Sequence, residues 1–233
     1  MCKAEHRFSA VLFDMDGVLI DSNAVIEQGW REAASMYGKT LSQDEISKHI
    51  HGQPGPHTIQ ALFNDLPLEA QRTIQAHIIH VENTAEYDPI PGVSQLITLL
   101  HAAGVRVGIV TSGWREKIDR VTAMLGVQTC ISVIVERDDV KKGKPFPDPY
   151  LLAAERLLTP ANKIIVFEDS KSGVTSAVRA GTCCIGIGGE ELIATGARFA
   201  IPNFTGVEVF TRIDGSTAIS LSPGHVLIAE VDQ

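Results

Sequence analysis

Two aspartates separated by one residue follow the first apolar run of the chain. Asp14 and Asp16 come directly after residues 11–13, and Gly17 follows them. Side chains at positions i and i+2 of an extended chain point to the same side, and Gly17 permits a sharp turn that keeps the two carboxylates together. One carboxylate could then attack an electrophile while the other moves a proton. Taken alone, the pattern also suits a turn in which aspartates bond to the main chain.

A second acidic pair, Glu168 and Asp169, ends the apolar run 164–167. Such a run is typical of a parallel strand covered on both faces. Ligands of open α/β sheets bind outside the carboxyl ends of the strands, so both acidic pairs are expected at that edge. Four carboxylates around one lysine leave a charge of about −3, and each like-charge pair at about 4 Å costs on the order of 4 kcal/mol. A divalent cation relieves this repulsion, and all-oxygen ligands favour Mg²⁺.

Two further segments offer groups that bind an anion. Thr111, Ser112 and Gly113 follow the apolar residues 108–110, and hydroxyl and main-chain N–H groups before a helix form a small anion cradle. Lys144 precedes three prolines within five residues, which stiffen its segment, and a positioned ammonium binds phosphate. Each segment alone also suits a helix cap or a solvated loop. Four such segments in order along the chain indicate one active site.

The elements that would position these residues form an α/β, doubly wound, Rossmann-like parallel sheet. Apolar runs predict strands at 8–13, 105–110, 131–135, 164–167, 182–187 and 198–201. Helical patterns between them cover 115–125, 149–158 and 171–180. Strands that alternate with helices predict a parallel sheet with helices on both faces.

A helical cap domain is expected to interrupt this core after its first strand. Residues 22–89 contain no convincing strand, and they fit helices at 23–37, 42–49, 57–65 and 68–87 with a break rich in proline and glycine at 52–56. The predicted domains are a discontinuous core of residues 1–20 and 91–233 and a cap of residues 21–90. The tail, residues 203–233, is expected to form a peripheral hairpin around Asp214 and Gly215.

The composition disfavours several classes of partner. Twenty Lys and Arg against 28 Asp and Glu give a formal charge of −8, which disfavours nucleic acid. No apolar run approaches the about 20 residues that cross a bilayer, and the first eight residues lack the apolar stretch of a secretory leader. The cysteines at 2, 130, 183 and 184 show no paired spacing, which favours reduced thiols. A cytoplasmic monomer or weak dimer, with no nucleic-acid or membrane partner, is expected.

The combination of Asp14-Met15-Asp16-Gly17, Thr111, Lys144 and Glu168-Asp169, in this order, resembles the haloacid dehalogenase superfamily of phosphotransferases. This resemblance implies a Rossmann-like core, a helical cap and Mg²⁺ as the cofactor. It implies that Asp14 is the nucleophile that becomes an aspartyl phosphate, and that Asp16 is the general acid and base. The phosphoryl group would be bound by Thr111 and Lys144, with Ser112 and Gly113 beside them. The metal would be held by Asp14, Asp169 and the main-chain carbonyl of Asp16, with Glu168 as a direct or indirect acidic partner.

Within that superfamily, Lys144-Pro145 and Glu168-Asp169-Ser170 are similar to the β-phosphoglucomutase-like branch and its small sugar- and polyol-phosphate phosphatases. Ile50-His51-Gly52 is similar to a cap loop of that branch, so His51 and Gly52 would reach the substrate. The implied activity is Mg²⁺-dependent hydrolysis of a small sugar or polyol phosphate. One alternative is a sugar phosphomutase, although the mutase carries a histidine where this chain has Ile26. The other is a metabolite-sensing protein that performs no catalysis on the same fold.

Overall fold

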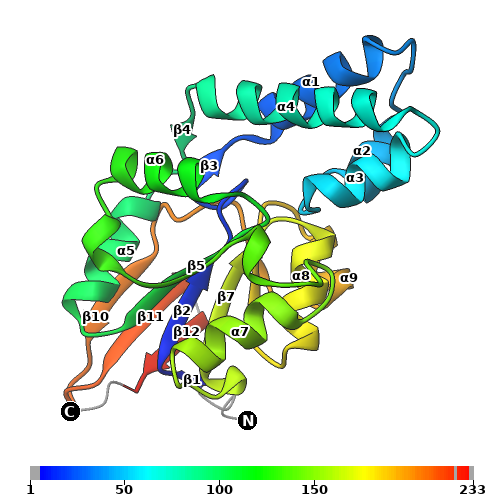
Figure 1. The fold of residues 1–233 in the computed structure, drawn as a ribbon. Coiled ribbons are helices and arrows are strands. Elements are labelled where there is room, and N and C mark those ends of the chain that lie inside the picture. Colours follow the sequence, from blue (N-terminus) through cyan, green and yellow to red (C-terminus); the bar gives the residue numbers. More distant parts are fainter. Residues whose placement is uncertain (1–5, 223–224, 231–233) are drawn as a thin grey trace.

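The structure is a computed structural model that describes residues 6–222 and 225–230. Its central sheet has six parallel strands in the order β6-β5-β2-β7-β8-β9 (Figure 1). The strands are β2 (Ala10–Phe13), β5 (Arg106–Val110), β6 (Ile131–Val135), β7 (Ile164–Glu168), β8 (Cys183–Ile187) and β9 (Ala200–Ile201). Leu12 of β2 pairs with Gly108 on one side and Val166 on the other, so the chain segments that follow β2, β5 and β7 emerge side by side.

Helices cover both faces of this sheet, which confirms the predicted doubly wound fold. One face packs against α5 (Val93–Ala102) and α6 (Arg115–Leu125), and the other packs against α7 (Asp148–Arg156), α8 (Lys171–Arg179) and α9 (Glu191–Thr195). Alternate residues of β2 explain the two cores, because Val11 and Phe13 enter the first and Ala10 and Leu12 enter the second. Short 3₁₀ turns lie at Gln128–Cys130, Arg137–Asp139 and Ala161–Lys163.

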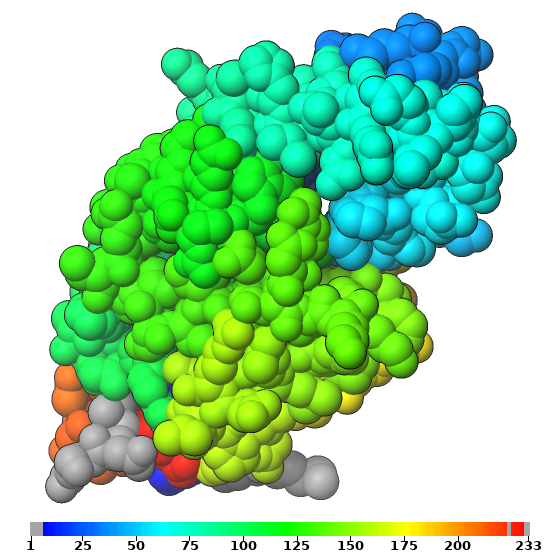
Figure 2. All heavy atoms as spheres, viewed as in Figure 1, coloured from blue at the N-terminus to red at the C-terminus, as the bar shows by residue number. Residues whose placement is uncertain are grey.

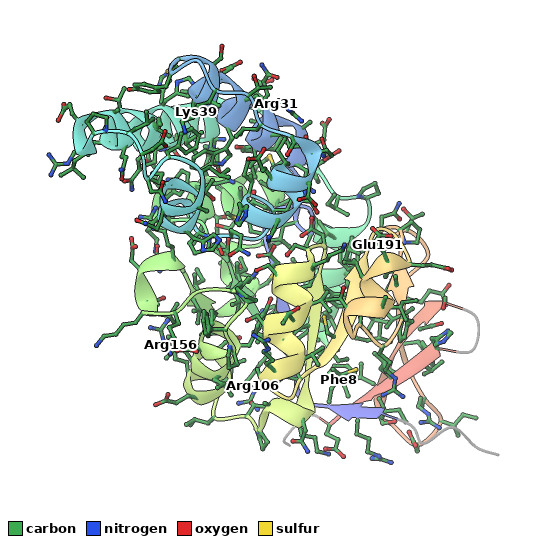
Figure 3. All side chains as sticks on the ribbon, turned by 90° about the vertical axis from the view of Figure 1, so that its right-hand side faces the viewer. Phe8, Arg31, Lys39, Arg106, Arg156 and Glu191 are labelled. Carbon is green, nitrogen blue, oxygen red and sulfur yellow. The ribbon has the colours of Figure 1, made fainter. Side chains whose placement is uncertain are left out.

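Four of the five described helices between β2 and β5 form a separate body above the sheet edge (Figures 1 and 3). They are α1 (Asn23–Ser35), α2 (Gln43–His49), α3 (Gly55–Leu62) and α4 (Leu68–Thr84). Their apolar faces bury a core of their own, in which the Trp30 and Phe63 rings stack with centroids 6.0 Å apart. In Figure 3, Arg31 and Lys39 lie on this body, while Phe8 and Arg106 lie in the body below it. The exact domain boundaries, 1–20 with 91–233 and 21–90, stay a prediction.

The connection between the two bodies contains a pair of strands that the sequence did not indicate. β3 (Ile20–Asp21) and β4 (Asp88–Pro89) pair in antiparallel orientation, and β4 lies within residues 22–89, where no strand was expected. A strand of two residues is too short to show the alternation of apolar and polar residues that identifies a strand, so neither strand of this pair can be recognised in the sequence. The preceding helix accordingly ends at Thr84 rather than at residue 87. Helix α3 begins at Gly55, before the predicted residue 57, because proline is accepted in the first turn of a helix.

A second sheet flanks the core, in the order β1-β12-β11-β10. Its strands are β1 (His6–Phe8), β10 (Glu208–Thr211), β11 (Thr217–Ser222) and β12 (His225–Ala229). The predicted tail hairpin is present as β10 and β11, but β12 and β1 extend it. The expected single strand 8–13 was wrong, because the chain leaves the second sheet after Phe8 and enters the central sheet at Ala10. The apolar pattern of the sequence indicates which residues are buried, but it does not indicate which of two sheets their strand joins.

The three described cysteines, Cys130, Cys183 and Cys184, are buried free thiols, and Cys2 lies outside the described residues. Among the residues that the structure describes, no helix combines the length and the apolar character needed to cross a bilayer.

Candidate active site

The carboxyl ends of β2, β5 and β7 bring the predicted nucleophile and the predicted lysine together. The Asp14 main-chain N–H donates to the Phe167 carbonyl (3.0 Å), which continues the sheet ladder past the end of β2. The Lys144 ammonium donates to Asp14 Oδ1 (2.6 Å) and to the Val110 carbonyl (3.1 Å). The same ammonium lies 2.6 Å from Glu168 Oε1. One buried lysine therefore contacts the ends of three strands.

Glu168 is fixed from several sides at the end of β7. It is fully buried, and its carboxylate accepts hydrogen bonds from the Tyr150 hydroxyl (2.6 Å) and the Ser170 hydroxyl (3.3 Å). Burial raises the pKa of the Tyr150 hydroxyl well above its ordinary value, so this group stays a hydrogen-bond donor. At Gly173 a Cβ atom would lie 1.9 Å from the Glu168 carboxylate, so the helix approaches this closely only through glycine. Glu168 is thus held where it contacts Lys144.

Three carboxylates converge beside this ion pair. Asp14, Glu168 and Asp169 each offer an oxygen within 4.8 Å of the others. Asp169 Oδ2 accepts from the Asn23 side-chain amide (2.9 Å), and a Cβ atom at Gly17, where φ is +74°, would lie 1.9 Å from that oxygen. Gly17 therefore makes room for Asp169 besides permitting the turn after the aspartates.

The negative charge of this cluster favours binding of a cation. Burial raises the pKa of Asp169 to about 7, and the neighbouring Glu168 carboxylate adds to the shift. Burial also raises the pKa of Asp14. Lys144 lowers this pKa, whereas the carboxylates of Glu168 and Asp169 raise it further. Two buried carboxylates and the half-buried carboxylate of Asp169 thus share one ammonium. A hard divalent cation with oxygen ligands fits this donor set and charge.

Asp16 faces the same site with its side chain 23% exposed. Its Oδ1 oxygen accepts hydrogen bonds from the Ser22 hydroxyl (2.6 Å) and from the Lys117 ammonium (2.6 Å). Lys117 lies on α6 and also donates to Glu82 Oε2 of α4 (2.6 Å). Burial disfavours its ammonium form, but the carboxylates of Asp16 and Glu82 outweigh this effect and raise the pKa of Lys117. Lys117 is therefore a buried cation that joins Asp16 to the helical body.

The segment after β5 presents donors beside Asp14. The Gly113 N–H donates to Thr111 Oγ1 (3.0 Å), so the hydroxyl proton of buried Thr111 is free to donate elsewhere. The Ser112 hydroxyl donates to the main-chain carbonyl of Gly52 (3.3 Å), which belongs to the loop between α2 and α3. A Cβ atom at Gly52, where φ is +68°, would lie 2.2 Å from Ser170 Oγ. Glycine at this position lets the loop lie directly on the sheet edge.

Two cavities flank the carboxylates, and the surface is hollowed between the two bodies (Figure 2). The first measures about 70 Å³ and is lined from below by Asp14, Asp16 and Asp169. From above its lining includes the apolar or aromatic side chains of Ile26, Trp30, Ile50, Ile59 and Ile78 and the polar side chains of Gln53, Gln75 and His51. His51 Nε2 lies 3.0 Å from Glu27 Oε1. The second cavity measures about 610 Å³ and opens beside Thr111, Ser112 and Lys144.

The structure brings all of the predicted site residues to one edge. The six at the centre are Asp14, Asp16, Thr111, Lys144, Glu168 and Asp169, and the four at the cavity walls are Ser112, Gly113, His51 and Gly52. Sequence reasoning missed the partners of these residues, namely Asn23, Glu82, Lys117 and Tyr150. Each lies within a helix and resembles an ordinary helix residue in the sequence. Only their positions at the open edge of the sheet reveal their contacts.

Comparisons with known proteins match most of the chain. A family model described as haloacid dehalogenase-like hydrolase matches residues 11–187. A phosphorylated carbohydrates phosphatase of Thermotoga maritima is 34% identical over 177 residues, covering 74% of this chain and 81% of that protein. Hexitol phosphatase A of Escherichia coli is 32% identical over 184 residues, covering 78% and 83%. The solved β-phosphoglucomutase of Clostridium difficile shares the fold, with a TM-score of 0.72, 19% identity, and coverage of 84% of this chain and 91% of that one.

Proposed function

We propose that this chain, which belongs to the haloacid dehalogenase-like hydrolases, hydrolyses a small sugar or polyol phosphate through an aspartyl-phosphate intermediate. The observation that carries the proposal is the buried contact of 2.6 Å between Asp14 and Lys144, with Asp16 facing the adjacent cavity. A positioned carboxylate, an ammonium beside it and a second carboxylate suit nucleophilic phosphoryl transfer. The relatives named as phosphatases of phosphorylated carbohydrates and of hexitol phosphates support the substrate class.

In the first half of the reaction, a carboxylate oxygen of Asp14 attacks phosphorus in line with the leaving oxygen. The new bond joins Asp14 to phosphorus, and the bond between phosphorus and the substrate oxygen breaks. Asp16 gives a proton to that oxygen, so the product leaves as an alcohol. Lys144 and the hydroxyl of Thr111 donate to the phosphoryl oxygens and stabilise their charge. The main-chain groups of Ser112 and Gly113 lie beside them.

In the second half, water attacks the aspartyl phosphate. Asp16, now deprotonated, takes a proton from this water, and the bond between phosphorus and Asp14 breaks. Inorganic phosphate is released, and Asp14 regains its carboxylate while Asp16 regains its proton. The same side chain thus serves first as acid and then as base. This sequence requires that Asp16 reach the cavity while Asp14 stays buried, as their exposures of 23% and 4% allow.

We propose Mg²⁺ as the cofactor. Asp14, Asp169 and the main-chain carbonyl of Asp16 would hold it, and Glu168 would be the acidic partner beside them. When bound, the metal supplies charge neutralisation between the carboxylate and the phosphoryl group. The convergence of three carboxylates on one ammonium supports this assignment. Asn23 would keep Asp169 oriented toward the site through its hydrogen bond of 2.9 Å.

Metal removal is expected to abolish turnover and to lower stability. In EDTA the phosphatase activity falls to background, and added Mg²⁺ restores it. Mg²⁺ at about 100 times its Kd stabilises the fold by about 2.7 kcal/mol, which thermal unfolding detects without any substrate. Asp169→Asn is expected to weaken Mg²⁺ binding by at least about tenfold. Asp119→Asn, at an exposed position of α6, is the matched control, and an equal loss in both variants contradicts the metal assignment.

We also propose that helices α1–α4 act as a cap over the sheet edge, within residues 21–90. The body contributes the apolar wall of the first cavity and the loop that carries His51 and Gly52. Closure of such a body excludes bulk water and selects the leaving group. The small cavity, about 70 Å³, favours a compact leaving group. Buried free thiols at Cys130 and Cys184 support a cytoplasmic location, and a monomer or weak dimer stays a prediction.

The decisive experiment is a panel of sugar and polyol phosphates assayed with Mg²⁺ for released inorganic phosphate. Release of free phosphate with a stoichiometric amount of alcohol supports the phosphatase. Transfer of the phosphoryl group to another hydroxyl of the same sugar supports a phosphomutase instead. The apolar Ile26 in the first cavity favours hydrolysis, since the mutase that the sequence resembles carries a histidine there. Binding of sugar phosphates with no turnover across the panel supports the metabolite-sensing alternative.

A further inference from the structure

Lys117 is a fully buried lysine that the proposed reaction does not use. Its side chain is 0% exposed, and its ammonium lies 2.6 Å from both Asp16 Oδ1 and Glu82 Oε2. The rings of Tyr87 and Trp114 lie 5.4 Å and 5.8 Å from its Nζ atom. Burying an ammonium is costly unless nearby carboxylates and hydrogen bonds compensate for the lost water. The compensation here comes from two other elements of the chain.

We propose that Lys117 is a positioning residue that holds Asp16 in its proton-transferring orientation when the cap is in place. This inference rests on the proposed function. Ser22 and Lys117 both donate to Oδ1 of Asp16, which leaves Oδ2 as the oxygen that carries the proton to the leaving group. An aspartate on a turn has free rotation about its side-chain bonds, and two donors at one oxygen select a single orientation. Lys117 thereby determines the position of Oδ2 of Asp16, the oxygen that carries the proton.

The second ion pair of Lys117 makes this orientation depend on the cap. Glu82 is in the last turns of α4, and its carboxylate is buried against α6. The Arg120 guanidinium donates to the Glu82 carbonyl (3.1 Å), which fixes the same turn of α4 on α6. If α4 moved away, Lys117 would lose one of its two buried carboxylates and its position beside Asp16 would be less defined. The Lys117 side chain therefore links the place of the cap to the geometry of the general acid.

Neighbouring contacts hold α4 on α6 without touching Asp16. The Trp114 indole N–H donates to Asn83 Oδ1 (3.0 Å), and the Asn83 amide donates to Glu116 Oε2 (2.7 Å). Asn83 thus supports the same cap contact as Glu82 from the adjacent residue. This arrangement supplies a matched control, because removal of the Asn83 amide breaks its hydrogen bonds to Trp114 and Glu116 and leaves both ion pairs of Lys117, with Asp16 and with Glu82, in place.

The test compares two substrates that differ in their need for a general acid. An alkyl phosphate releases a poor leaving group that requires a proton, whereas p-nitrophenyl phosphate releases a stable anion that does not. Lys117→Met is expected to lower kcat/KM for the alkyl phosphate on the order of 100-fold and to change that for p-nitrophenyl phosphate little. Asp16→Asn is expected to show the same selective loss, at equal or greater size. Asn83→Ala is expected to change kcat/KM by the same factor for both substrates.

A second variant separates positioning from general stability. Lys117→Met together with Glu82→Gln removes one charge of each sign, so thermal stability is expected to recover while the selective loss on the alkyl phosphate persists. Recovery of alkyl phosphate turnover together with stability overturns the inference, and so does an equal loss on both substrates in Lys117→Met. If the wild type hydrolyses neither substrate with Mg²⁺ present, the proposed phosphatase function itself fails.

Discussion

Asp14→Asn is expected to reduce phosphate release by at least about 10⁴-fold while the protein stays folded. The amide cannot attack phosphorus as a carboxylate does, and none of the described carboxylates beside it stands in its place. Glu168 accepts the Tyr150 hydroxyl and contacts Lys144, and Asp169 accepts the Asn23 amide. Loss of the nucleophile therefore removes the first chemical step rather than slowing it.

The fold is expected to tolerate this substitution. Asparagine has the same shape as aspartate, and its Oδ1 oxygen still accepts from Lys144. Lys144 keeps Glu168 as its counter-charge at 2.6 Å. Replacing the carboxylate also removes a charge that burial disfavours, since the pKa of Asp14 is raised. Thermal unfolding of the variant should therefore lie near that of the wild type.

The measurement combines phosphate release, thermal unfolding and acid quenching. Wild-type protein quenched during turnover is expected to carry a phosphoryl group on the peptide that contains Asp14, and Asp14→Asn is expected to carry none. Asp21→Asn, an exposed aspartate on β3, is the matched control and should keep both activity and the phosphoryl adduct. Near-normal turnover in Asp14→Asn, or an adduct on another residue, contradicts the nucleophile assignment.

The principal site residues could be predicted because they follow strands. Apolar runs at 11–13 and 164–167 locate two strand ends, and parallel strands bring their carboxyl ends to one edge. Asp14 and Asp169, 155 positions apart, therefore had to meet if the strands were adjacent, as β2 and β7 are. Lys144 follows no strand directly; its proline-rich segment indicated a positioned ammonium, and the resemblance to a known family implied that it binds the phosphoryl group.

The partners of these residues could not be predicted, because their contacts depend on how helices pack. Lys117 lies among charged residues of α6, and a lysine in such a sequence usually faces water. Its burial follows from tertiary packing, which places Glu82 of α4 and Asp16 against α6. Tyr150 is similarly an ordinary aromatic residue of α7 until the fold places its hydroxyl on Glu168. Helix periodicity identifies which face of a helix is buried, but it does not identify the polar atom of a neighbouring element that contacts this face.

The second sheet was predicted only in part for a related reason. The hairpin of β10 and β11 shows alternating residues and an Asp-Gly turn, which are local signals. The parallel pairing of β1 with β12 joins residues 6–8 to residues 227–229, and no local pattern reports a contact over that separation. Phe8 is buried in either arrangement, so its apolar character agrees with both. Long-range strand pairing was therefore the part of the fold that the sequence could not supply.

Lys144→Met is expected to lose both stability and activity. The Lys144 ammonium lies 2.6 Å from Asp14 and from Glu168 in a buried site. Removing one partner of a buried ion pair costs about 3–5 kcal/mol, because the remaining carboxylates keep their desolvation without a counter-charge. Activity is expected to fall by about 10²–10³-fold as well, since a donor to the phosphoryl oxygens is lost. Lys142→Met, exposed on the same loop, is the matched control for the loss of one positive charge.

The stability of this variant is expected to depend on pH in a defined direction. In the metal-free fold, burial raises the pKa of Asp169 from its ordinary 3.8 to about 7, and the pKa of Asp14 is raised in the same direction. The folded state therefore binds more protons than the unfolded state between these values, so stability falls as the pH rises through this window. Loss of Lys144 removes the cation that opposes these shifts, which steepens the fall.

Thermal unfolding in EDTA across this pH window is the measurement. Lys144→Met is expected to approach the wild type at low pH, where the buried carboxyls are protonated, and to fall further below it as the pH rises. Added Mg²⁺ is expected to stabilise the variant at high pH without restoring activity, because the metal replaces the lost charge but not the donor to phosphate. A difference from the wild type that does not change with pH contradicts the role of Lys144 as the counter-charge of these carboxylates. The losses of stability and of activity in Lys144→Met would then have separate causes. They share one cause only if the same ammonium compensates the buried carboxylates in the resting site and binds the phosphoryl group during turnover.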